Sequence, residues 1–151
     1  MSRISRPLIV ALGIAVIVIG TISWWSFSPM LLPPEQPEFT VLLSGSLQEV
    51  DASHTGSGTV QLVQSDTGNQ SILFIDVFIT SGPDLYVYLS NKSSFSGIYD
   101  DPGEYVSLGL TPAVTGSFTV PIPENINGTD YASVLIWCQA YAVLFTYAVL
   151  E

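Results

Sequence analysis

Short apolar segments alternate with short polar segments over most of this chain. Beyond residue 38 the apolar segments are rich in Val, Ile, Leu, Phe, Tyr and Thr, which favour β-strands. Clusters of Gly, Pro, Ser, Asn and Asp separate them, as in tight turns. The predicted strands are 39–43, 59–63, 71–79, 85–89, 104–108, 117–122, 133–137 and 142–149. Because no segment here has helical periodicity, we predict an all-β domain, an antiparallel β-sandwich or barrel of about eight strands.

The last two predicted strands are apolar on both faces, which is typical of central strands. Strict alternation along 133–139 places Val134, Ile136 and Cys138 on one face. Strict alternation along 142–149 places Val143, Phe145, Tyr147 and Val149 on one face, and Ala142, Leu144, Thr146 and Ala148 on the other. We expect a core hairpin that turns at 139–141, or a bent edge that a second chain covers.

A different pattern precedes this domain. Residues 8–22 read LIVALGIAVIVIGTI, without a charged residue, and Trp24 and Trp25 follow after one serine. The stretch is long enough for a helix that spans a bilayer, and Trp favours the membrane interface. We therefore predict a transmembrane signal-anchor at 7–27, in contact with membrane lipid. A cleaved signal peptide and a buried core helix are the alternatives, but no small-residue cleavage pattern follows the apolar run.

The charges flanking this segment predict its orientation. Arg3 and Arg6 precede it, so the positive-inside rule places residues 1–6 in the cytoplasm as a short tail. Residues 28–38 contain Pro33, Pro34 and Pro37 and predict an extended stalk. We expect a single-pass protein of the cell membrane, with its N-terminus in the cytoplasm and residues 39–151 outside as an extracytoplasmic domain.

This location would permit glycosylation. Three N-x-S/T sequences fall in predicted loops, and their acceptors are Asn69, Asn91 and Asn127. They are candidate glycosylation sites.

Composition narrows the range of functions. Among 151 residues there are 3 Lys or Arg and 13 Asp or Glu, with a net charge of −10. This charge excludes a nucleic-acid binder that tracks phosphates. One Cys and one His exclude an intrachain disulfide, a four-Cys metal cluster and a three-His metal site. An acidic domain would instead attract a basic partner, such as a cationic electron carrier.

The only thiol is Cys138, and the residues alone leave its role open. It is a small buried apolar residue, a ligand of a metal or haem, a redox-active thiol, or one half of an interchain disulfide.

Two further candidates lie in loops. His54 sits among small residues, where a ring nitrogen stays accessible; it bonds its own backbone or serves as a ligand or proton carrier. Asp84 ends the turn 81–84, where it closes the turn or presents a carboxylate at the mouth of the sandwich. No catalytic triad, paired acid site or haem-attachment motif can be assembled, so independent enzymatic activity is not expected.

Four blocks of the sequence, in order, resemble the DM-13 domain, an electron-transfer module often found beside DOMON domains. The most specific are GPDLYVYLS at 82–90 and VLIWC at 134–138. The first of these motifs closes the second block, which begins at 74–78. The other motif lies in the fourth block, which runs from Tyr131 through Val143 and Phe145 to Leu150. The weaker first and third blocks run from 39 to 60 and from 108 to 121. The resemblance covers essentially all of 39–150.

The resemblance implies an all-β extracytoplasmic domain with a proposed role in electron transfer. The role centres on the family cysteine, here Cys138, as a bare thiol or as a ligand of a prosthetic group. Carried over by motif, Cys138, His54 and Asp84 are the candidate cofactor-binding residues, and haem, copper or no cofactor are all open. The partner would be a membrane redox complex or a cationic electron carrier. The alternative function is a non-catalytic accessory subunit that docks on a membrane or cell-surface complex.

Overall fold

Each strand of the described chain pairs with antiparallel neighbours, as short apolar segments joined by tight turns favour. The computed structural model describes residues 38–151. The predicted tail at 1–6, the anchor at 7–27 and residues 28–37 of the stalk lie outside the described residues. Within 38–151, no helix has the length and apolar character needed to span a membrane.

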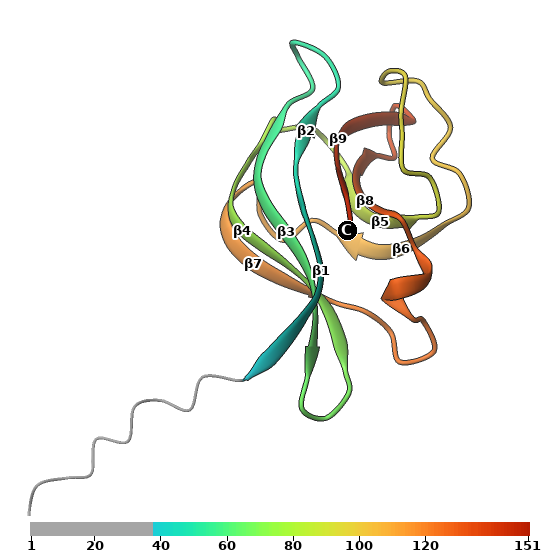
Figure 1. Cartoon of the computed structure of the whole chain (residues 1–151). Coiled ribbons are helices and arrows are strands. Elements are labelled where there is room, and N and C mark those ends of the chain that lie inside the picture. The colour runs from blue at the N-terminus through green and yellow to red at the C-terminus, as the bar shows by residue number, and fades with distance from the viewer. Residues whose placement is uncertain (1–37) are drawn as a thin grey trace, which may run out of the picture. The chain divides into compact units, whose positions relative to one another are not determined.

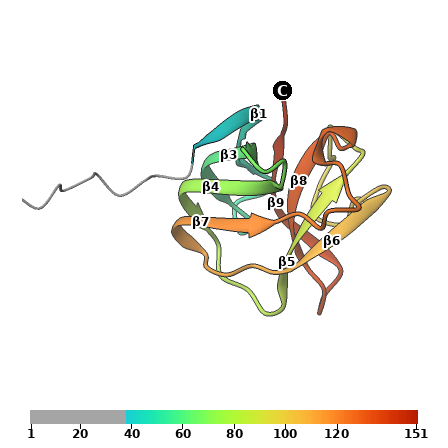
Figure 2. The ribbon, with the colours of Figure 1, turned by 90° about the horizontal axis from the view of Figure 1, so that it is seen from below.

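Two sheets pack face to face as a β-sandwich (Figures 1 and 2). The first has the order β1 (Phe39–Ser46), β3 (Gly56–Ser65), β4 (Gln70–Ile79), β7 (Thr115–Pro121). The second has the order β2 (Gln48–Glu49), β9 (Val143–Val149), β8 (Ser133–Cys138), β5 (Leu85–Ser90), β6 (Tyr105–Leu110). A short 3-10 helix, η1 (Gly128–Asp130), precedes β8.

The all-β prediction is confirmed, and each predicted strand overlaps an observed one. The additional strand is β2, which has two residues and is too short to produce a periodic pattern. The core between the sheets contains Leu62, Phe74, Val87 and Ile136, all completely buried. The predicted hairpin at 139–141 is also confirmed, because β8 pairs with β9 and both lie inside the second sheet.

The predicted alternation of β9 is wrong beyond Phe145. Ile136 pairs with Thr146 and Trp137 pairs with Leu144, so Phe145 is an extra residue in a β-bulge. The bulge shifts the period by one residue. As a result Ala148 belongs to the core, whereas Tyr147 packs against the opposite face of the sheet.

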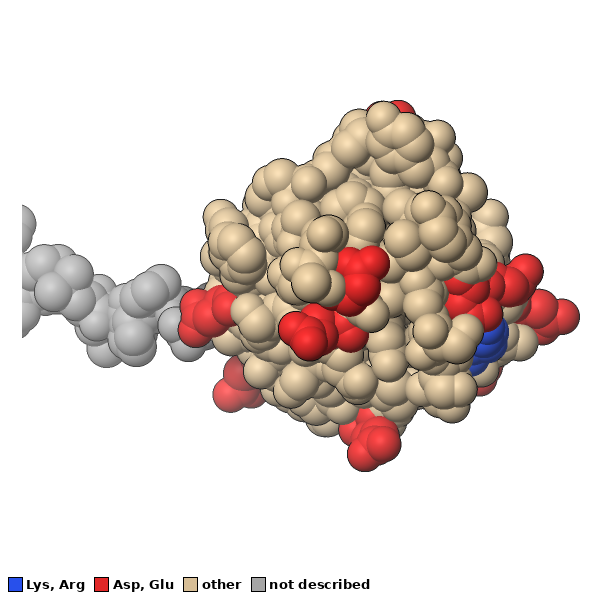
Figure 3. Space-filling view, turned by 90° about the horizontal axis from the view of Figure 1, so that it is seen from above, with Lys and Arg blue, Asp and Glu red and all other residues tan. Residues whose placement is uncertain are grey.

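That opposite face is partly covered by the loop 91–104. Lys92 is the one Lys or Arg of the described residues, and its Nζ lies 3.0 Å from Asp100 Oδ1 and donates to Asp101 O at 2.8 Å. Figure 3 shows this cation beside a group of acidic side chains, on a surface that is otherwise mostly uncharged. The loop also reaches the sheet directly, since Leu144 N donates to Ile98 O.

Acid should release this loop. The Ser96 N–H and then the Lys92 ammonium hold the pKa of Asp100 at about 2, below its usual 3.8. A carboxylate with a lowered pKa stabilises the folded loop above pH 3.8, and this contribution is lost as the pH falls through about 2. We expect pepsin cleavage within 91–104 of the wild type to rise steeply as the pH falls from 3.8 to about 2. In Asp100→Asn, cleavage should already be high at pH 3.8.

The control is Asp66→Asn, which removes an exposed carboxylate from the β3–β4 hairpin and should behave like the wild type. Similar profiles for Asp100→Asn and the wild type would contradict this role.

Candidate functional site

The fold gathers the three residues singled out from the sequence toward one end of the sandwich. Asp84 directly precedes β5, and Cys138 is the last residue of β8, where it pairs with Leu85. His54 lies in the loop before β3. The turn 81–84 and the aromatic residue Phe145 connect them.

Cys138 is a free and completely buried thiol. Its Sγ donates a hydrogen bond to Pro83 O at 3.0 Å, so the turn 81–84 lies over the sulfur. The same turn is tied to the strand a second time, because Gln139 N donates to Asp84 O at 3.0 Å. A thiol in this position cannot reach the sulfur of another molecule unless the turn moves.

The conformation of the turn 81–84 is set by its backbone and its packing, and the carboxylate of Asp84 takes no part in it. Asp84 has a positive φ of 49°, a conformation that a non-glycine residue adopts at some cost. Its side chain is exposed and makes no hydrogen bond to any other described residue. Gly82 packs against Phe145 so closely that an added Cβ would lie 2.5 Å from the ring Cζ. The turn therefore requires glycine at 82, and the carboxylate of Asp84 remains free at the surface.

His54 also packs against this aromatic ring. Its imidazole is perpendicular to the Phe145 ring, with ring centroids 4.7 Å apart. Nδ1 bonds Asp51 Oδ1 at 2.8 Å, and the same oxygen accepts from the backbone N–H groups of Ser53 and His54. These bonds, with the His54 side chain first, lower the pKa of Asp51. The imidazole is thus bound within its own loop, but by a carboxylate and not by the backbone.

Sequence reasoning did not single out Asp51 or Phe145 as site residues. Asp51 carried a local signal, because an Asp three residues before a His in a small-residue loop can close a turn around it. Phe145 carried no such signal, because its contacts lie 91 residues away at His54 and 63 residues away at Gly82. The contacts run in series from His54 through Phe145 and Gly82 to the peptide that covers Cys138.

A metal or haem does not fit this arrangement. Residues 38–151 contain no group of three His, Cys, Asp or Glu side chains that could hold a metal ion. The thiol of Cys138 donates to Pro83 O and has no exposed face, so it cannot contact a metal or a haem unless the turn 81–84 moves.

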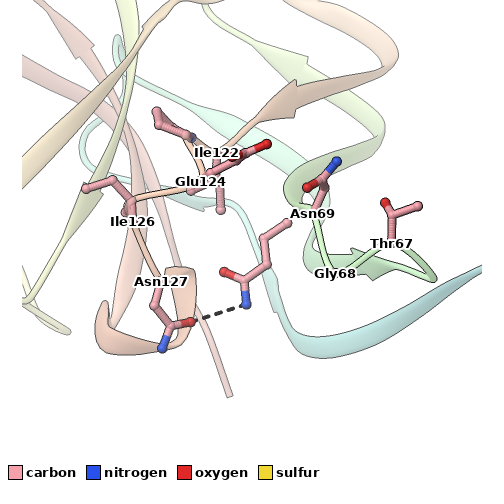
Figure 4. A pocket seen from close by; sticks show the side chains of 9 residues that line it. Thr67, Gly68, Asn69, Ile122, Glu124, Ile126 and Asn127 are labelled. Carbon is pink, nitrogen blue, oxygen red and sulfur yellow. Dashed lines mark hydrogen bonds between the residues drawn. The ribbon is translucent and has the colours of Figure 1, made fainter.

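A hollow of about 460 Å³ lies elsewhere, between the β3–β4 hairpin and the segment around η1 (Figure 4). It is lined by Thr67, Gly68, Asn69, Gln70, Ile122, Pro123, Glu124, Ile126 and Asn127. Its polar groups bond one another: Gln70 Nε2 donates to Asn127 Oδ1 at 3.2 Å, and Gln70 Oε1 accepts from Gly128 N. The hollow holds no titratable residue except Glu124, so it offers no redox chemistry.

Two of the three glycosylation candidates have structural bonds. The Asn127 amide caps η1 by accepting from Thr129 N, and the Asn91 amide accepts from Glu104 N. Asn69 is exposed in the β3–β4 hairpin. Glycosylation at these positions stays a prediction.

A known family matches most of the described residues. A family model described as "Electron transfer DM13" matches residues 47–150, which include β2 to β9 and the residues His54, Asp84 and Cys138. Comparisons with curated proteins and with solved structures gave no match. The family match spans more than half of the chain and both of its sheets, and the chain belongs to the DM13 electron-transfer family.

Proposed function

We propose that this protein is a membrane-anchored, extracytoplasmic module that transfers single electrons, with the bare thiol of Cys138 as its redox group. The family points to a redox-related role. The observation that carries the proposal is the burial of the thiol beneath the turn 81–84, which opens one of the two most specific motifs of the chain. Gly82 allows the turn to pack on Phe145, and Pro83 accepts the S–H hydrogen bond.

Burial separates two kinds of thiol chemistry. Disulfide exchange and metal ligation require the sulfur to touch its partner, and buried cysteines are inert in such reactions. Transfer of a single electron needs no contact, because an electron can tunnel through intervening protein. A sulfur with no exposed surface is therefore suited to one-electron exchange.

The proposed step breaks one bond. The S–H bond of Cys138 breaks, one electron passes to a strong one-electron oxidant on the partner, such as a high-valent haem, and the proton passes to water that reaches the sulfur when the turn 81–84 moves. The sulfur becomes a thiyl radical, and a later electron and proton restore the thiol. No second cysteine is consumed, in agreement with the single Cys of the chain.

The partner would be a membrane redox complex or a cationic electron carrier. An anchor at 7–27 would hold the domain near membrane proteins and raise its effective concentration there. The acidic surface would steer a cationic carrier toward it at low salt.

The test uses the full-length protein in detergent with a light-generated tris-bipyridine ruthenium(III) oxidant, under air. A thiyl radical captures dioxygen, so peptide mass spectrometry should find sulfinic or sulfonic acid at Cys138 after illumination, and little in the dark control. In Cys138→Ser, whose hydroxyl can still donate to Pro83 O, tyrosyl radicals trapped by rapid freezing should persist longer because the sulfur donor is lost.

Oxidation confined to Tyr and Trp in the wild type, with Cys138 unchanged, would overturn the proposal. So would tyrosyl radicals that decay equally fast in the wild type and in Cys138→Ser. Circular dichroism of the variant checks that its fold is retained.

A further inference from the structure

Three aromatic rings form a stack on the outer face of the second sheet. Tyr88 of β5 lies in the middle. The Tyr105 ring of β6 stacks on it with centroids 4.3 Å apart and planes at 13°, and the Trp137 ring of β8 lies on it at 6.2 Å and 21°. These rings come from three neighbouring strands, so the stack crosses the sheet from β8 to its β6 edge.

The stack begins beside Cys138 and ends at the surface. Trp137 is the residue before Cys138, on the opposite face of β8. Trp137 is buried and Tyr88 is only 2% exposed, whereas Tyr105 is 48% exposed. The buried sulfur is thus joined to the surface by one peptide link and three aromatic side chains.

The surroundings keep the central ring fixed and neutral. Gln139 Nε2 donates to the Tyr88 hydroxyl at 2.7 Å. Burial raises the pKa of Tyr88, so its phenol stays protonated at neutral pH. At the outer end, Glu104 adjoins Tyr105 in sequence, and Asp101 lies in the preceding loop. These exposed carboxylates would attract a cationic oxidant to the β6 edge.

We propose that Trp137, Tyr88 and Tyr105 are the path by which an electron from Cys138 reaches an oxidant bound at the β6 edge. This inference rests on the proposed function, and it names the exit route and the surface where the oxidant binds.

The electron moves outward one ring at a time. The oxidant takes one electron from Tyr105, whose phenolic proton passes to water and leaves a neutral tyrosyl radical. Tyr88 then reduces Tyr105, Trp137 reduces Tyr88, and Cys138 reduces Trp137. Each ring releases one proton when it is oxidised and takes one up when it is reduced, so the protons of the three rings cancel and the S–H proton of Cys138 is the one lost overall. The net change is one electron to the oxidant, one proton to water, and a broken S–H bond at Cys138.

The test repeats the ruthenium photo-oxidation on the full-length wild type, Tyr105→Phe, Tyr88→Phe and Tyr99→Phe. Phe keeps the ring and its stacking, but it is much harder to oxidise. Tyr99 is the control, because it is 81% exposed, more than Tyr105, and its ring has no stacking partner among the described residues. We expect both stack variants to lose most of the Cys138 oxidation and Tyr99→Phe to keep it.

The outcomes separate this inference from the proposed function. Absence of Cys138 oxidation in the wild type would overturn both. Wild-type levels in Tyr105→Phe and Tyr88→Phe would overturn the path and leave Cys138 as the redox group. A loss in Tyr99→Phe equal to that in Tyr105→Phe would also overturn the path, because exposure alone would then govern oxidation. Slower oxidation of the wild type at high salt is expected from the acidic β6 edge.

Discussion

Replacing Phe145 by Ala is expected to lower the free energy of unfolding by about 3–5 kcal/mol and to expose Cys138 to thiol reagents. The ring is buried, and it contacts both His54 and Gly82. Its removal leaves a cavity in the core and takes away the surface on which the turn 81–84 rests. Because Pro83 in that turn covers the sulfur, the turn should open more often over Cys138.

Chemical denaturation and the rate of labelling by a thiol-reactive dye measure the two effects. Phe78→Ala is the matched control: Phe78 also lies in a strand, but it is 58% exposed, so its loss should change stability by no more than about 0.5 kcal/mol. The interpretation would be wrong if Phe145→Ala lost stability while labelling remained as slow as in the wild type. The turn would then be held by its hydrogen bonds alone.

Sequence periodicity is sufficient to predict every strand of this fold except the two-residue β2, because each buried strand must present apolar residues to the core. It does not predict the irregularities in strand pairing. The one at Phe145 in β9 and the one between Phe74 and Val77 in β4, for example, are set by pairing with other strands, which no local pattern encodes. Asp76 adopts a φ of 48° at the β4 bulge, where its amide donates to Ser117 Oγ.

The candidate site was predicted as individual residues, and its connections were not. Cys138, His54 and Asp84 could be named from motifs, but the contacts that relate them cross long stretches of chain. The carbonyl that accepts from Cys138 belongs to Pro83, and the carboxylate that orients His54 belongs to Asp51. The aromatic stack is equally invisible in the sequence, because Trp137, Tyr88 and Tyr105 become neighbours only when β8, β5 and β6 pair.

Gly58→Ala is expected to be the second severe change, because β3 passes very close to β4 at this residue. Gly58 has a φ of 107°, and an added Cβ would lie 2.7 Å from Val77 Cα and 2.8 Å from Asp76 O. The backbone strain costs about 1–3 kcal/mol, and forcing an extra methyl group into a packed contact typically costs a similar amount. The backbone of β4 cannot move aside as a flexible side chain would, so we expect both penalties in full.

A second glycine separates the two penalties. Gly68 in the β3–β4 hairpin also has a positive φ, of 88°, but an added Cβ there meets nothing within 4 Å. Gly68→Ala should therefore show the strain alone, and chemical denaturation should find Gly58→Ala less stable than Gly68→Ala by about 1–3 kcal/mol. Equal losses would mean that the β4 bulge yields to the methyl group. A larger loss at Gly58 would mean that the bulge at Asp76 is rigid and does not yield to the methyl group.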